Sequence, residues 1–189
     1  MVGLNAGRKT AGSPDFAFPK TVESDSRRNL EQALHANKPV EALRAFINLS
    51  IASSQISSEK SLPLLQEIDS ISNMLPEPFG AIGLLLEAQI YANIYQANRF
   101  TYNSRTVAEN MADDNPEFWD KNIFRQRIDS LATLALHQKK AAEKLPLSRL
   151  TPLITPAEDL GAFTVYDFIV YKYIELTSLF SSSAVIPFF

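Results

Sequence analysis

The chain has 189 residues, of which 46% are apolar and 21% charged, with a formal net charge of −3, six glycines and no cysteine. One globular domain fits this length, and the few glycines favour helices over a β-rich fold with many turns. The small negative charge argues against nucleic acid as a partner, because phosphate backbones need clustered Lys and Arg, and the lack of cysteine excludes disulfides and thiolate chemistry within the chain.

The first two helices are predicted to form an antiparallel hairpin. The first helix extends from about Val22 to Asn37, where the sequence Asn-Lys-Pro stops it. Pro39 suits the first turn of the second helix, since its missing N–H needs no partner there. An alternative interpretation is that these two helices form a tetratricopeptide-like helix pair. The predicted buried face of the second helix consists of Val40, Leu43, Phe46, Ile47 and Ile51.

Two further helices follow, and the second of them is predicted to be the central one. It has a wide apolar face that begins at Ile82, and it ends near Ala97. The helix before it carries an apolar stripe at helical spacing, formed by Leu64, Leu65, Ile68, Ile71 and Leu75.

A fifth helix is predicted to start at Asn115. Asn115 is a good helix cap, and Pro116 and Glu117 suit the first turn. The helix carries Trp119 on its apolar side. Three lysines mark its end and are interpreted as a solvated face: Lys139, Lys140 and Lys144.

The last helix follows an irregular connector. Residues 145–163 contain three prolines and one glycine, which disfavour regular structure. Thr164 is predicted to cap a helix that extends to about Leu179. No repeat of fixed period recurs along the chain. The predicted fold class is therefore all-α, a mainly antiparallel bundle of five or six helices rather than a regular solenoid.

The predicted organisation is a leader, one helical domain and a tail. Residues 1–20 lack an apolar stretch long enough for a signal peptide, and we expect a disordered or cloning-derived leader there. Residues 21–182 are the helical domain. Residues 183–189 form an apolar tail, which we expect to lead into a further domain that covers it. The apolar run 168–180 contains Lys172 and Glu175 and is too short for a membrane span.

The sequence contains no recognisable catalytic or metal-binding motif. His35 and His137 lie on separate predicted helices and are interpreted as surface or helix-end residues. The acidic group Asp113, Asp114 and Glu117 lacks the spacing of a calcium loop. We instead expect these acids to stabilise a helix N-terminus, where their negative charge offsets the exposed N–H groups. The chain is therefore predicted not to be an enzyme, with no catalytic residue, cofactor or metal.

A series of aromatic residues has two interpretations. It could line a groove for an extended peptide or glycan, or it could belong to the core, with hydroxyl groups that reach the rim. The series comprises Tyr91, Tyr95, Tyr166, Phe168, Tyr171 and Tyr173.

Two arginines are predicted to be structural. Arg99 and Arg105 follow the central helix, and Asp167 lies on the last helix. We expect a bracket in which at least one arginine binds Asp167 or an ordered backbone carbonyl, because such a pair fixes two segments. A ligand-binding role for the two arginines is the alternative.

The middle and end of the chain resemble a known family. Residues 82–180 resemble the helical segment that precedes the macroglobulin-type β-sandwich domains in large alpha-2-macroglobulin-like proteins of Bacteroidetes. In addition to the structural or interacting residues Asn98, Arg99, Arg105, Trp119, Tyr166 and Asp167, the resemblance rests on Tyr91, Tyr95, Phe100, Thr106, Asp113, Asp114 and Phe168.

The resemblance implies a non-catalytic scaffold or docking module of a cell-envelope or periplasmic protein. The parent protein would be a protease-trapping inhibitor, so the implied partners are the following domains of the same chain and, through the parent, proteases. The bait region, β-sandwich run and thioester motif of the family do not occur here, so its inhibitor chemistry does not transfer. The alternative function is a stand-alone tetratricopeptide-like module that binds a peptide or glycan.

Overall fold

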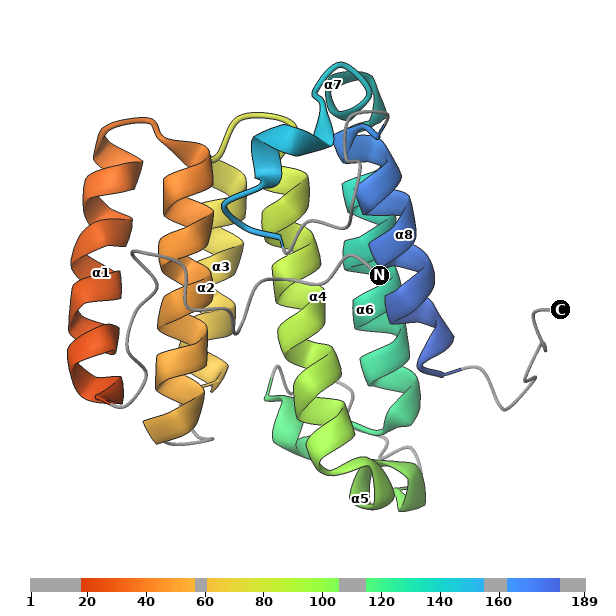
Figure 1. Ribbon diagram of the computed structural model, residues 1–189. Coiled ribbons are helices and arrows are strands. Elements are labelled where there is room, and N and C mark those ends of the chain that lie inside the picture. Colours follow the sequence, from red (N-terminus) through yellow and green to blue (C-terminus); the bar gives the residue numbers. More distant parts are fainter. Residues whose placement is uncertain (1–17, 57–60, 106–114, 155–162, 181–189) are drawn as a thin grey trace, which may run out of the picture.

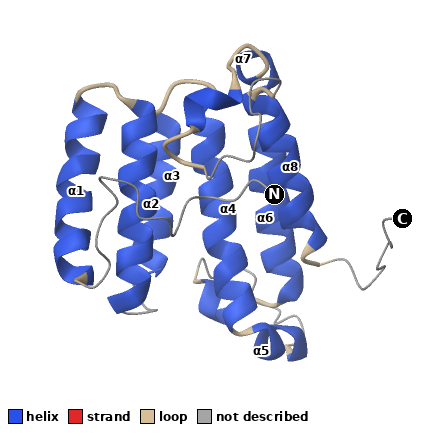
Figure 2. Cartoon of the chain, viewed as in Figure 1, coloured by secondary structure: helices blue, strands red, loops and turns tan. Residues whose placement is uncertain are grey.

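The computed structural model describes residues 18–56, 61–105, 115–154 and 163–180. Within these ranges the chain forms eight α-helices and no strand (Figure 1), so the predicted all-α fold is confirmed (Figure 2). Six helices are long, in agreement with the five or six predicted. The long helices are α1 (Pro19–His35), α2 (Pro39–Ile56), α3 (Ser61–Met74), α4 (Phe79–Ala97), α6 (Lys121–Leu136) and α8 (Val165–Ser178); the short ones are α5 (Arg99–Ser104) and α7 (Lys139–Ala142).

Helix α4 is the central helix, as predicted. In Figure 1 the α1–α2 hairpin forms one edge of the bundle, α6 and α8 form the other, and α4 lies between them. α4 contacts α2, α3, α6 and α8. A helix surrounded in this way must be apolar on most of its faces. Its sequence meets this condition with Ile82, Leu85 and Leu86, all of which are buried.

A left-handed turn closes the α1–α2 hairpin. Asn37 has a φ of 53°, which is the conformation that glycine or asparagine adopts after the C-terminus of many helices. The Lys38 N–H donates to the Ala33 carbonyl at 2.9 Å, and the Asn37 N–H donates to the Leu34 carbonyl at 3.1 Å. Pro39 then starts α2, as predicted. The turn thus satisfies two terminal carbonyls of α1 and reverses the chain.

Two glycines of α4 allow a close approach to α3. A Cβ atom added at Gly83 would lie 2.2 Å from the Ser72 hydroxyl oxygen, and one added at Gly80 would lie 2.8 Å from the Ser72 carbonyl oxygen. The Ser72 hydroxyl is itself fixed, since it donates to the Ile68 carbonyl at 2.7 Å. Side chains at these two positions would force α3 and α4 apart in a closely packed interior.

The fifth long helix starts later than predicted. Asn115 does cap a helix, but only the short 3-10 helix η2 (Pro116–Phe118), by accepting from the N–H two residues later at 3.0 Å. α6 begins after Asp120, whose carboxylate accepts from the N–H groups two and three residues later at 2.7 and 2.9 Å. Asp is as good an N-cap as Asn, and the prediction overlooked this second cap. Trp119 therefore lies between two capped segments and not on a helix.

The same helix also ends earlier than predicted. α6 stops at Leu136, while Lys139 and Lys140 belong to the separate helix α7. Gln138 lies between the two helices, and its side-chain oxygen accepts from the Ala81 N–H at 3.1 Å. The first N–H groups of a helix have no partner within the helix. The break therefore places a side chain from the end of α6 over the start of α4.

The connector before the last helix is irregular, as predicted. Its described part includes one short 3-10 helix, η3 (Leu147–Leu150). The Leu147 N–H donates to the Phe163 carbonyl at 2.9 Å and joins the two ends of the connector. α8 then begins at Val165 with Thr164 as its N-cap, which confirms the predicted start.

Parts of the predicted organisation fall outside the described residues. Of the predicted leader, only residues 18–20 are described, and α1 already begins at Pro19. The predicted apolar tail, residues 183–189, lies outside the described ranges, as do Thr106, Asp113 and Asp114. Among the helices that are described, none is both long and apolar enough to span a bilayer.

The turn at Asn37 gives a first prediction. Asn37→Ala is expected to lower the free energy of unfolding by about 1 kcal/mol, because alanine tolerates the left-handed conformation poorly. Asn37→Gly is expected to leave stability unchanged or to raise it. Asn29→Ala, an exposed position within α1, is the matched control and should not destabilise, since alanine favours helix. Urea unfolding followed by circular dichroism measures all three; a larger loss for Gly than for Ala would contradict the assigned turn.

Candidate functional site

Arg105 forms a clamp between α5 and η2. One nitrogen, Nη1, donates to the backbone carbonyls of Glu117 and Trp119, the latter at 3.0 Å. The guanidinium also lies over the Tyr102 ring, 5.1 Å from its centroid. Hydrogen bonds from a charged donor are stronger than neutral ones. Of the two partners predicted for the arginines, Asp167 or a backbone carbonyl, Arg105 therefore binds backbone carbonyls.

Asp167 is not part of this bracket, which corrects the prediction. Its carboxylate accepts from the Thr164 N–H and from the Thr164 hydroxyl, both at 2.7 Å, and forms a capping box at the start of α8. These hydrogen bonds lower the pKa of Asp167, and the bond from the Thr164 backbone contributes more than the bond from its side chain. The start of α8 lies next to α7, at the opposite end of the bundle from α5 (Figure 1). Arg99 is exposed at the start of α5.

An aromatic cluster lies beneath the clamp. Trp119 is buried and stacks on Tyr91, with ring centroids 5.2 Å apart and an angle of 19° between the planes. Its edge contacts Phe124, also at 5.2 Å. Tyr95 contacts Phe124 at 5.6 Å. For Tyr91 and Tyr95 the core interpretation is therefore correct. Of the other residues in the predicted series, Phe168 is buried, Tyr166 and Tyr173 are half-buried and Tyr171 is exposed.

An ion pair between a buried glutamate and an exposed arginine joins α4 to α6, and the sequence prediction overlooked it. Glu87 is 1% exposed, and its Oε1 accepts from Arg127 Nη2 at 2.9 Å. Its other oxygen, Oε2, is buried without a hydrogen-bond partner in the described structure. Burial raises the pKa of Glu87, and the charge of Arg127 partly opposes that rise. The available signal was a glutamate within the apolar run of α4.

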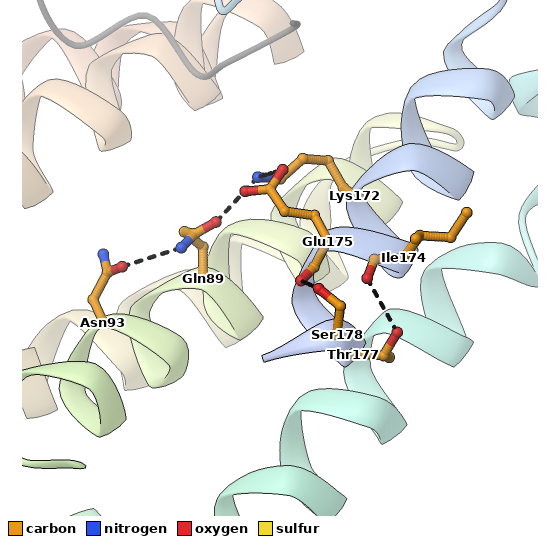
Figure 3. A network of polar contacts seen from close by, with 7 residues as sticks. All are labelled: Gln89, Asn93, Lys172, Ile174, Glu175, Thr177 and Ser178. Carbon is orange, nitrogen blue, oxygen red and sulfur yellow. Dashed lines mark hydrogen bonds and ion pairs between the residues drawn. The ribbon is translucent and has the colours of Figure 1, made fainter. Parts of the chain in front are cut away.

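A second polar network joins α4 to α8 (Figure 3). Lys172 is 4% exposed, and its Nζ donates to Gln89 Oε1 at 3.1 Å and to Glu175 Oε2 at 2.9 Å. Gln89 in turn donates to Asn93 Oδ1 at 3.1 Å. Figure 3 shows the Asn93 amide nitrogen on the side away from Gln89. The network thus satisfies a buried ammonium group and fixes the orientation of Asn93.

A groove lies along the second half of α4, and we call it the α4 groove. It has a volume of about 340 Å³ and is bounded by α2, α3, α4, α5 and η2. Asn98 and Tyr102 both line it, Asn98 with an exposed side chain and Tyr102 with a buried one. Pro116 and Glu117 form the wall that Arg105 holds in place. The remaining lining residues are Ser50, Ile51, Ser54, Leu62, Leu64, Ile90, Asn93, Ile94 and Ala97.

The last described helix carries exposed apolar side chains, which we call the α8 strip. Phe163, just before α8, is 52% exposed, and Tyr171 and Ile174 on α8 are 42% and 60% exposed. Ile174 also lines a groove of about 430 Å³ between α6 and α8, together with Arg125 and Asp129. Exposed apolar patches with a polar border are common at surfaces that bind other domains.

The remaining candidate residues do not converge on a reactive site. His35 and His137 are both exposed, at the ends of α1 and α6. Tyr166 is half-buried near the opposite end from α5, with the Lys139 ammonium 5.3 Å from its ring centroid. In the described ranges no three His, Asp or Glu side chains are arranged to hold a metal ion.

The chain matches no protein-family model, no curated protein and no solved structure. A functional proposal therefore rests on the geometry of the described residues together with the sequence resemblance. The α4 groove and the α8 strip each offer apolar contact area to another molecule, and large apolar side chains are also exposed elsewhere in the described residues, as at Phe100 and Phe118.

The clamp gives a second prediction. Arg105→Ala is expected to lower the free energy of unfolding by about 1–3 kcal/mol, because it removes charge-assisted hydrogen bonds to two carbonyls. Arg99→Ala is the matched control on the same short helix and should change stability by less than about 0.5 kcal/mol. Thermal unfolding and urea titration measure both variants. An unchanged melting curve for Arg105→Ala would instead favour a ligand role for this residue.

The buried glutamate gives a third prediction, about pH. Because the folded-state pKa of Glu87 is raised, the folded state binds this proton more tightly than the unfolded state, and stability falls as pH rises from the unfolded to the folded pKa. Glu87→Gln removes this fall. The melting temperature of the variant relative to wild type should therefore rise as the pH increases above about 4. Glu31→Gln, an exposed site, corrects for loss of one carboxylate. A difference that stays constant with pH would contradict the prediction.

Proposed function

We propose that this chain is a non-catalytic helical docking module of an alpha-2-macroglobulin-like cell-envelope protein. In this proposal the α8 strip packs against a macroglobulin-type β-sandwich domain of the same parent protein. The parent acts in the periplasm or cell envelope as a protease-trapping inhibitor, and the helical module holds its domains in place. The single observation that carries the proposal is the exposure of Phe163, just before the last described helix, and of Tyr171 and Ile174 on it.

The use of the polar side chains supports a non-catalytic role. Acid–base or nucleophilic catalysis requires several reactive groups that converge on one cavity. Arg105 binds backbone carbonyls and Asp167 caps α8. Glu87 pairs with Arg127 on α6, and Lys172 on α8 donates to Gln89 on α4. Each of these charged groups has a sufficient reason in the fold. Glu117 is the one titratable carboxylate among the described residues that line the α4 groove.

The chemistry of the α8 strip supports a domain as its partner. Contacts between domains of one chain cover surfaces that are more polar than a protein core. The strip combines large apolar side chains with Arg125 and Asp129 in the adjacent groove. A following β-sandwich domain would remove Ile174 and Tyr171 from water and leave the charged side chains of Arg125 and Asp129 at the border of the contact.

Site-specific crosslinking tests this proposal. The protein is expressed from its natural gene with a photoreactive amino acid in place of Ile174. The crosslinked peptides are then identified by mass spectrometry. Peptides from a macroglobulin-type β-sandwich domain are expected, because the strip would lie in direct contact with it. The same group at Arg28, exposed on α1 at the other edge, is the control and should not give these products. Crosslinks from Ile174 to other proteins alone, or none at all, would overturn the proposal.

A second candidate function is supported by the α4 groove. A concave groove lined by outward-pointing tyrosine and asparagine side chains would favour a tetratricopeptide-like peptide- or glycan-binding module. Asn93 and Asn98 line the α4 groove. Tyr91 and Tyr95, the tyrosines expected with them, are buried in the core. The groove therefore supports a binding role with an aliphatic floor in place of an aromatic one.

A further inference from the structure

We infer that the α4 groove binds a short extended peptide that carries aliphatic side chains and a basic residue. This inference concerns a different surface from the α8 strip and holds independently of the parent protein. The groove volume of about 340 Å³ lies within the range of sites that bind small molecules or peptide side chains.

The floor of the groove selects aliphatic groups. Ile51 from α2, Leu62 from α3, and Ile90 and Ile94 from α4 line it, and each is half-buried. Because three helices contribute, a ligand that covers this floor removes apolar surface of all three from water. A glycan would place hydroxyl groups against these side chains without hydrogen-bond partners, which is costly. The floor therefore favours a peptide over a glycan.

The rim can read a peptide backbone. On the α4 side, Asn93 Oδ1 is occupied by Gln89, so its amide nitrogen, which faces away from Gln89, is left to donate to a peptide carbonyl (Figure 3). On the α2 side, the Ser50 and Ser54 hydroxyls donate to the Ile47 and Ile51 carbonyls at 2.8 Å. Their oxygens keep lone pairs that accept from a peptide N–H. The two sides thus complement the two polar groups of an extended backbone.

The charge at one end of the groove selects a basic residue. Glu117 is the one charged side chain among the described lining residues. It is exposed, and its carboxylate forms no ion pair within the described part of the chain. A lysine or arginine of the ligand next to Glu117 would gain a favourable interaction, whereas an acidic residue there would be repelled.

Two parts of the groove border, the Glu117 end and the α4 side, are fixed before a ligand arrives. Arg105 holds the Glu117 wall through its bonds to two carbonyls, one at 3.0 Å. The Lys172–Gln89–Asn93 chain of hydrogen bonds holds the Asn93 amide on the α4 side. A site whose groups are already in place loses less conformational entropy on binding.

Fluorescence anisotropy with labelled pentapeptides and the whole 189-residue chain tests the inference. The probe is Lys-Leu-Val-Leu-Lys, which is expected to bind saturably. Glu-Leu-Val-Leu-Glu and Lys-Ser-Gly-Ser-Lys are expected to bind at least about tenfold more weakly, since one has the wrong charge and the other lacks apolar contact. The absence of saturable binding by the first peptide, or equal binding by all three, would overturn the inference.

Three variants locate the site. Ala97→Trp, at an exposed position that lines the groove, fills it and should weaken binding of the Lys peptide by about tenfold or more. Glu117→Gln should reduce the preference for the Lys peptide over the Glu peptide to about threefold or less. Ile174→Arg on the α8 strip is the matched control and should bind the peptide as wild type does. Full binding by a folded Ala97→Trp variant would place the site elsewhere.

A negative result in the peptide titration can be distinguished from a negative result in the Ile174 crosslinking experiment. Loss of the Ile174 crosslink leaves the peptide titration untouched, because the α8 strip and the α4 groove share no lining residue. Conversely, a chain that binds none of the peptides can still dock a β-sandwich domain through α8.

Discussion

The burial of α4 is the constraint on which the rest of the fold depends. This helix contacts four of the other long helices, yet its sequence contains the buried Glu87 and the half-buried Gln89. A charge or amide taken out of water without a partner costs several kcal/mol. The neighbouring helices must therefore supply partners at defined heights along α4. Arg127 does so from α6 and Lys172 from α8, and each pair fixes the register of its helix against α4.

These pairs contribute more to register than to net stability. Buried ion pairs often stabilise a protein no better than well-packed apolar residues would, because desolvation offsets much of the attraction. Glu87 illustrates this, since burial raises its pKa in spite of Arg127 and leaves one oxygen without a hydrogen bond. Apolar packing alone tolerates sliding of one helix along another. The Glu87–Arg127 pair does not, because a shift of one turn leaves the buried Glu87 carboxylate without its partner. The polar residues of α4 thus select one arrangement among many apolar ones.

The features that were predictable from sequence are those set by local chemistry. Pro39 and Thr164 act within one helical turn, so both helix starts follow from residue type. The partners of Arg105 were not predictable individually, because every residue has a backbone carbonyl. Asp167 was assigned to an arginine because spacing does not tell which end of α8 lies near α5. It is the C-terminal end, where Phe180 contacts Tyr95 at 4.8 Å. A local signal did exist, since Asp167 follows Thr164 at capping-box spacing.

The position of the α4 groove follows from the same packing. α1 packs extensively on α2, and α3 on α4, but α2 contacts α3 and α4 much less. This seam between the hairpin and the rest of the bundle leaves Ile51 and Ile94 only half-buried on its two sides. Sequence periodicity marks both residues as apolar helix positions and cannot tell a filled seam from an open one. The inferred peptide site at this sparsely packed seam lies next to segments that Arg105 and Lys172 hold in place, so binding there would leave the contacts that fix α4 intact.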